Sequence, residues 1–128
     1  MSRAIERARA SLDDFLRTAA APPPGTSNFG LKVRISDETN TEYFWVNTVS
    51  VQSAGFGGIL GNEPRAVKKY KLGERIAFQR DQIVDWTYID RSKGSPRMVG
   101  NFTACALLTK EPPAQAREYK ERIGLACE

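Results

Sequence analysis

The chain has 128 residues, of which 41% are hydrophobic and 27% are charged, and its formal net charge is +4. This composition excludes a disordered chain and a coiled coil, and no apolar run approaches the roughly 20 residues of a membrane span. There is no His, the commonest general base and metal ligand, and two Cys are too few for a structural zinc site. We therefore predict a single domain over residues 1–128, with no metal and no cofactor.

The excess of basic residues suits nucleic acid or an acidic partner, but Lys and Arg are spread along the chain. Nucleic acid is therefore the disfavoured partner, and no membrane partner is expected. The first residues mix Arg, Ala and acids and do not form a signal peptide. With Met1 as the native start this predicts a cytoplasmic protein. An exported domain whose leader has been replaced by a Met would look the same, and it would be periplasmic.

Residues 2–21 predict an amphipathic helix that packs on a sheet. The apolar side chains recur every three or four residues, which places them on one face: Ile5, Ala8, Leu12, Phe15, Leu16 and Ala19. The segment from Ser11 to Asp14 also fits a capping box, in which case the stable helix begins there and residues 2–10 fray. The prolines from Pro22 to Pro24 end the helix, because proline has no N–H to donate.

The next segment predicts a three-stranded meander. Leu31, Val33 and Ile35 alternate with polar residues, and a polar turn leads to a second strand over Tyr43–Gln52. A third strand follows over Phe56–Leu60. Its Gly57-Gly58 pair predicts a β-bulge, and the alternative is a close approach of another backbone or of a ligand.

The remaining elements are a short helix over Pro64–Tyr70, a second hairpin from Arg75–Gln79 and Gln82–Ile89, and a polar loop over residues 90–98. Asn101 is predicted to be the N-cap of a helix that runs to about Lys110, which we prefer to a central strand. A last helix spans Pro113–Ile123 and ends at Gly124. Together these elements predict an α+β fold: a curved antiparallel sheet of about five strands, with the N-terminal helix and two C-terminal helices packed on it.

Polar residues at the ends of strands provide the candidate site. Asp85 precedes Trp86 in an apolar strand, where a carboxylate must be paired or hydrogen-bonded, either by the protein or by a ligand. Asn62 and Asn101 each follow a Gly at a turn, where amides usually satisfy backbone groups. With the aromatic residues of the second strand, the candidate binding residues are Tyr43, Trp45, Asn62, Asp85, Trp86 and Asn101.

Two cysteines remain as reactive candidates. Cys105 lies in a predicted helix and Cys127 just past the last one, so the two are either bridged or remain a buried and a free thiol. A catalytic thiol is not expected, since no His is present to activate it. No phosphate loop, nucleophile elbow or catalytic triad is present, so we assign no catalytic residue.

Four motifs, in order and at matching spacing, resemble the YegJ-like family of bacterial domains of unknown function: Glu42-Tyr43-Phe44-Trp45-Val46, Gly58-Ile59-Leu60-Gly61-Asn62-Glu63-Pro64, Asp85-Trp86-Thr87-Tyr88 and Gly100-Asn101-Phe102-Thr103. The family often carries His where Tyr43 stands, so any role of that His is lost here or taken by a phenol. Some relatives resemble exported proteins with a similar C-terminal end, which favours the Cys105–Cys127 bridge.

The resemblance implies a small accessory or immunity-type protein that acts by binding another protein. We therefore expect a non-catalytic protein-binding domain rather than an enzyme. The alternative is a small-ligand or anion site, with hydrolytic chemistry as a variant, formed near Asn62, Asp85 and Asn101.

Overall fold

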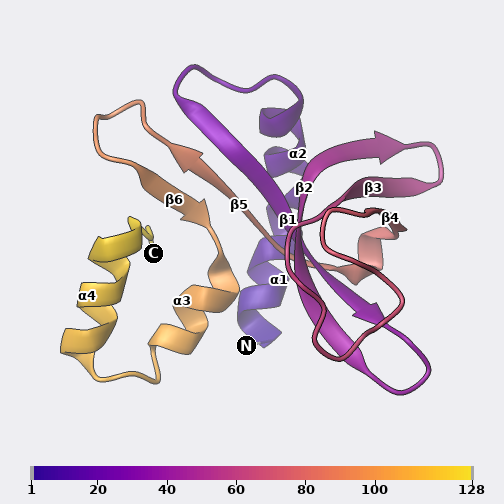
Figure 1. Ribbon diagram of the computed structural model, residues 1–128. Coiled ribbons are helices and arrows are strands. Elements are labelled where there is room, and N and C mark those ends of the chain that lie inside the picture. Colours follow the sequence, from indigo (N-terminus) through magenta and orange to yellow (C-terminus); the bar gives the residue numbers. More distant parts are fainter. Residues whose placement is uncertain (1, 128) are drawn as a thin grey trace. The chain divides into compact units, whose positions relative to one another are not determined.

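The computed structural model describes residues 2–127, which contain four α-helices and six strands (Figure 1). Contacts divide the chain into two compact units. The sheet unit comprises Phe29–Val84, and the helical unit comprises the residues up to Asn28 and those from Asp85 onward. The α+β class is confirmed, with six strands in place of about five. That the whole chain is a single domain stays a prediction.

The sheet unit is a four-stranded antiparallel sheet. Its strands are β1 (Thr26–Ser36), β2 (Thr41–Gln52), β3 (Gly55–Leu60) and β4 (Arg75–Phe78), in the order β4-β3-β2-β1. One face of the sheet carries buried apolar side chains: Leu31, Val33, Ile35, Phe44, Val46, Leu60, Ile76 and Phe78. The predicted meander of three strands is confirmed, because β2 pairs with both β1 and β3.

The predicted bulge at Gly57-Gly58 is wrong. The irregularity lies on the partner strand, between Asn47 and Ser50 of β2, where Thr48 adopts a left-handed conformation with φ of 50°. Both glycines pair regularly with β4. A Cβ on Gly58 would collide with Cγ1 of Val46, so the glycine permits a close approach of β2. This was the alternative prediction.

Two further predictions between β3 and β5 are wrong. Residues 64–70 form an irregular loop in place of a helix, and the carboxylate of Glu42 accepts the backbone N–H groups of Arg65, Ala66 and Val67 in this loop. The predicted second hairpin does not form, since β4 pairs with β3, and a 3₁₀ turn, η1 (Arg80–Gln82), follows it. β5 (Ile83–Asp90) pairs instead with β6 (Arg97–Gly100), a strand that begins at the end of the segment predicted to be a polar loop.

In the helical unit, the predicted N-terminal helix is two helices, α1 (Ser2–Ala10) and α2 (Leu12–Ala20), separated at Ser11. The capping box is wrong, because the hydroxyl of Ser11 donates to the carbonyl of Arg7 and makes no cap contact with α2. Residues 2–10 are helical. α2 packs on β5 through Phe15, whose ring stacks on Trp86 at 5.1 Å between centroids.

The two C-terminal helices are α3 (Phe102–Leu108) and α4 (Pro113–Ile123), so a helix after Asn101 is confirmed. α4 ends at Gly124, which adopts the left-handed conformation with φ of 71°. Asn101 lies at the N-cap position of α3 but is itself left-handed, with φ of 53°, and its side chain makes no cap hydrogen bond. The predicted capping role of its side chain is therefore wrong. Within residues 2–127, no helix combines the length and the apolarity needed to cross a bilayer.

Candidate functional site

The face of the sheet unit opposite its apolar core carries aromatic and basic side chains. Lys32 stands opposite Trp45, and Arg34 stands opposite Tyr43, in the β1–β2 register. Residues paired in this way share a face. Arg75 lies on the same face through its pairing with Ile59, which pairs with Asn47. We call this surface the outer face and define it by Lys32, Arg34, Tyr43, Trp45 and Arg75.

The aromatic residues of the outer face are partly accessible. Tyr43 is 48% exposed, and Trp45 is half-buried. The ammonium group of Lys32 lies 5.8 Å from the centroid of the Tyr43 ring and 5.9 Å from that of Trp45, within the range of cation–π attraction. None of the strand residues on this face of β1 to β4, all of which the structure describes, is acidic.

The loop after β3 fixes the backbone of Trp45. The side-chain oxygen of Asn62 accepts the N–H of Trp45 at 2.6 Å, and Gly61 donates its N–H to the carbonyl of Trp45 at 2.8 Å. On the side of β2 that pairs with β3, Asn62 thus adds one more hydrogen bond beyond the end of β3. This is the structural role that amides at turns usually have.

A second contact joins the same two segments, and sequence reasoning missed it. The carboxylate of Glu42 accepts the backbone N–H groups of Arg65, Ala66 and Val67 at 2.9–3.0 Å. These hydrogen bonds, with those from Val67 and Ala66 the strongest, lower the pKa of Glu42 from its ordinary value of 4.5. The only feature of the sequence that pointed to this contact was an acidic residue beside the buried Phe44. We call this contact the Glu42 clasp.

In the helical unit, Asp85 is fully buried and holds the start of α3. One carboxylate oxygen accepts the N–H groups of Trp86 and Phe102, and the other accepts the N–H and the hydroxyl of Thr103. The distances are 2.6–3.1 Å. Asp85 therefore performs from a distant strand the capping that was predicted for Asn101.

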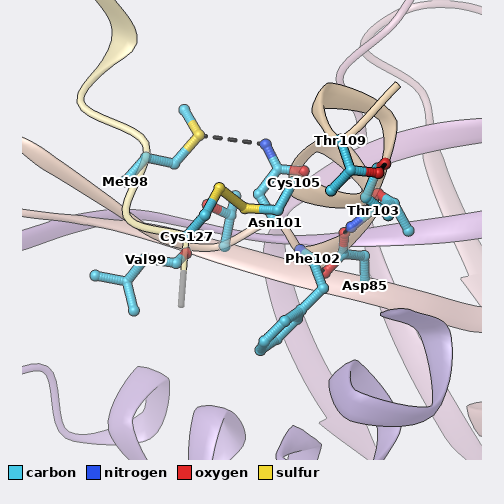
Figure 2. The surroundings of a disulfide bond; sticks show 11 residues. Asp85, Met98, Val99, Asn101, Phe102, Thr103, Cys105, Thr109 and Cys127 are labelled. Atoms are coloured by element: carbon cyan, nitrogen blue, oxygen red, sulfur yellow. Dashed lines mark hydrogen bonds between the residues drawn. A yellow bond between two sulfur atoms is a disulfide. The ribbon is translucent and has the colours of Figure 1, made fainter. Parts of the chain in front are cut away.

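The neighbours of Asp85 have structural contacts as well. The indole N–H of Trp86 donates to the hydroxyl of Ser11 at 3.0 Å, and its ring packs between Phe15 and the edge of Phe102. Asn101 donates its backbone N–H to the carbonyl of Trp86 at 2.8 Å, and its side-chain amide faces the sulfur of Met98. Figure 2 shows this last pair beside the disulfide.

Cys105 and Cys127 form a disulfide, as in the bridged one of the two alternatives. It joins α3 to the segment after α4 (Figure 2). That segment runs alongside β6: Met98 donates its N–H to the carbonyl of Gly124 and accepts the N–H of Ala126, at 2.7 and 3.0 Å. We call residues 124–127 the tail segment.

The structure gathers the six predicted site residues into two groups. Tyr43, Trp45 and Asn62 belong to the sheet unit, and Asp85, Trp86 and Asn101 belong to the helical unit. The motifs pair in the same way. The strand motif that begins at Glu42 is tied to the Gly61–Pro64 turn and the residues after it, and the motif that begins at Asp85 is tied to the one that begins at Gly100. The motifs that carried the family resemblance therefore include residues whose side chains form hydrogen bonds with the backbone of another motif.

The chemical capacity of these groups follows from their contacts. The oxygens of Asn62 and Asp85 already accept backbone donors, whereas Tyr43 on the outer face is 48% exposed. Among residues 2–127, no three acidic or sulfur ligands gather in a metal-binding arrangement.

The profile of a bacterial family described as "Uncharacterized protein conserved in bacteria (DUF2314)" matches residues 1–127. The chain belongs to this family. It is similar to the "Uncharacterized protein YegJ" of Escherichia coli (strain K12), with 29% identity over 123 residues that cover 96% of this chain and 76% of that protein. This confirms the family resemblance inferred from the four motifs. No solved structure gives a significant match.

Proposed function

We propose that this member of the DUF2314 family is a non-catalytic binding module whose outer face binds an acidic segment of another protein. The observation that carries the proposal is a half-exposed Tyr43 beside Trp45, on a strand face with three basic residues and no acid. Tyr, Trp and Arg are the residues most enriched in binding hot spots. Net positive charge on the face favours a partner segment of opposite sign.

The brace around Trp45 supports the same function. Asn62 and Gly61 fix the backbone of this residue, and Lys32 lies close to both aromatic rings. A surface that is ordered before its partner arrives loses little conformational entropy on binding. The outer face is therefore pre-organised for recognition.

The alternative, a small-ligand or hydrolytic site near Asn62, Asp85 and Asn101, has less support. A hydrolytic site needs a carboxylate or amide directed at a substrate. The Asp85 carboxylate accepts four hydrogen bonds from protein groups, and the Asn62 oxygen accepts one from Trp45. We propose no catalytic role for any of the three.

The test is site-specific photocrosslinking in bacterial cells. A benzoyl-phenylalanine probe replaces Tyr43 in one variant and Tyr119, an exposed tyrosine of α4, in a matched control. We expect a protease-sensitive adduct from position 43 only. We expect Lys32→Gln to weaken binding of the isolated partner by about tenfold, and polyglutamate to compete with it.

Three results would overturn the proposal. Equal adducts at positions 43 and 119 would remove the role of the outer face. An adduct destroyed by nuclease would show that the face binds nucleic acid, for which aromatic residues interleaved with basic ones are also suited. Competition by polylysine in place of polyglutamate would contradict the charge argument.

We propose an oxidising compartment, the periplasmic alternative of the two expected from the sequence. The Cys105–Cys127 disulfide supports it, because disulfides are rare in reducing compartments. Alkylation of the protein in freshly lysed host cells, followed by mass measurement, tests this assignment. Two alkylated cysteines before any reduction would place the protein in the cytoplasm.

A further inference from the structure

The helical unit contains a pocket of about 260 Å³ that none of the roles above uses. Its walls are mainly apolar and come from β5, β6, α3 and the tail segment: Trp86, Val99, Gly100, Phe102, Ala126 and the Cys105–Cys127 disulfide. The charged residues that line it are Arg7 and Arg97, and no acidic residue among those described does so. The pocket thus combines an apolar lining with two cations.

The apolar walls are fixed by contacts outside the pocket. Trp86 is held by its hydrogen bond to Ser11 and by its stacking on Phe15. Phe102 meets the Trp86 ring edge-on, at 5.5 Å between centroids. A Cβ on Gly100 would collide with the backbone oxygen and the ring of Trp86. The glycine therefore allows β6 to pack directly against Trp86 in this wall of the pocket. A pocket with such walls is largely formed before a ligand enters.

The guanidinium group of Arg97 defines the polar part of the ligand, and Arg7 adds a second positive charge to the lining. Arg7 lies over the ring of Phe102, at 5.0 Å from its centroid, and so stands at the aromatic wall. Arg97 comes from β6, on which Val99 and Gly100 also lie. Guanidinium groups bind planar carboxylates through paired hydrogen bonds. Asp90, the partner of Arg97 in the β5–β6 register, does not line the pocket; hydrogen bonds from Ser92 lower its pKa, and the charges of Lys93 and Arg97 lower it further.

We propose that this pocket binds a small carboxylic acid with an apolar body, its carboxylate at Arg97 and its body against Trp86 and Phe102. The volume lies just below the range of about 300–1,000 Å³ found for most ligand pockets, which limits the ligand to on the order of ten non-hydrogen atoms. A branched or cyclic monocarboxylate meets both requirements.

The test uses the fluorescence of Trp86. The chain has two tryptophans, so a Trp45→Phe variant leaves Trp86 as the sole reporter. Cyclohexanecarboxylate is the probe, and cyclohexanecarboxamide is a neutral control of nearly equal shape. We expect the acid to change the Trp86 emission saturably and the amide to bind at least about tenfold more weakly, as befits a charge-assisted hydrogen bond.

Matched variants separate the pocket from general charge effects. Arg97→Gln should weaken binding of the acid about tenfold, whereas Arg117→Gln, an exposed position of α4 outside the pocket, should not change it. Ala126→Phe fills the pocket and keeps both arginines, so it should abolish the response. Thermal unfolding of each variant shows that it is folded. Equal binding of acid and amide, equal affinity of the two arginine variants, or no saturable response would each overturn the proposal.

Discussion

Thr103 donates both its backbone N–H and its hydroxyl to the same carboxylate oxygen of Asp85, at 2.9 and 2.6 Å. The two residues are 18 positions apart, so this pair joins β5 to the first turn of α3. Both side chains are buried. The beginning of α3 therefore depends on a residue outside the helix.

Replacement of Asp85 should be among the most destabilising single changes in the chain. Asp85→Ala removes the acceptor of the Phe102 N–H and of the buried N–H and hydroxyl of Thr103, and we expect the free energy of unfolding to fall by about 3 kcal/mol or more. Urea denaturation followed by circular dichroism measures the loss. Asp81→Ala, at an exposed position, should change it by about 0.5 kcal/mol or less. Similar effects of the two variants would contradict the capping role.

The Glu42 clasp should make stability depend on pH in the acid range. The pKa of Glu42 is lowered in the folded protein, so its contribution is present above the ordinary value of 4.5 and is lost as the pH falls through the folded pKa. Glu42→Gln should flatten this part of the stability curve, measured by urea denaturation at successive pH values. Glu111→Gln, an exposed control, should leave the curve unchanged. Parallel curves for the wild type and Glu42→Gln would refute the clasp.

Loss of the disulfide should destabilise the protein through the chain entropy of the unfolded state. The cysteines are 22 positions apart, for which the loop-closure model gives about 3 kcal/mol. We expect the Cys105→Ala/Cys127→Ala double variant to unfold at a correspondingly lower urea concentration, and the wild type to match it only when a reductant is present. A reductant that shifts the double variant as much as the wild type would show that the effect has another origin.

Relief of backbone strain at Thr48 should stabilise the sheet unit. Thr48 is β-branched and left-handed, a conformation that costs an L-residue roughly 1–2 kcal/mol and glycine little. We expect Thr48→Gly to raise the free energy of unfolding by about 1 kcal/mol. Thr41→Gly, in the extended part of the same strand, should lower it by roughly 0.5–1 kcal/mol. A loss of stability in both variants would show that Thr48 is not strained.

The elements that sequence periodicity predicted well are those whose signals are local. The β1–β2 hairpin followed from alternating residues around a polar turn, and α4 followed from Pro113 at its start and Gly124 at its end. In each case the residues that decide the structure are neighbours in the sequence or one strand away. The family itself was recognisable from four short motifs.

The errors arose where a side chain from a distant part of the sequence forms a hydrogen bond with the segment in question. Residues 64–70 have a helix-start signal at Pro64, yet they form a loop whose backbone N–H groups bind Glu42, more than 20 positions earlier. Ser11 resembles a helix cap, yet its hydroxyl receives the indole N–H of Trp86, 75 positions away. No pattern within a window of sequence contains these contacts.

The candidate site was predicted in part. Tyr43 and Trp45 were selected as aromatic residues at the end of a strand, and the register places them with Lys32 and Arg34 on one face. Asn62, Asp85 and Asn101 were selected as polar residues at turns, where the choice between backbone support and ligand contact depends on which donors lie nearby. Glu42 was missed because its partners belong to a loop whose path the sequence does not define.

The tail segment has a consequence for solubility. A strand at the border of a sheet offers unpaired N–H and C=O groups to any extended chain that meets it, which is how many proteins begin to aggregate. On the outer border of β6, both backbone groups of Met98 are already occupied by Gly124 and Ala126, and the disulfide keeps these residues in place. The tail segment thus protects this part of the β6 border from pairing with another chain.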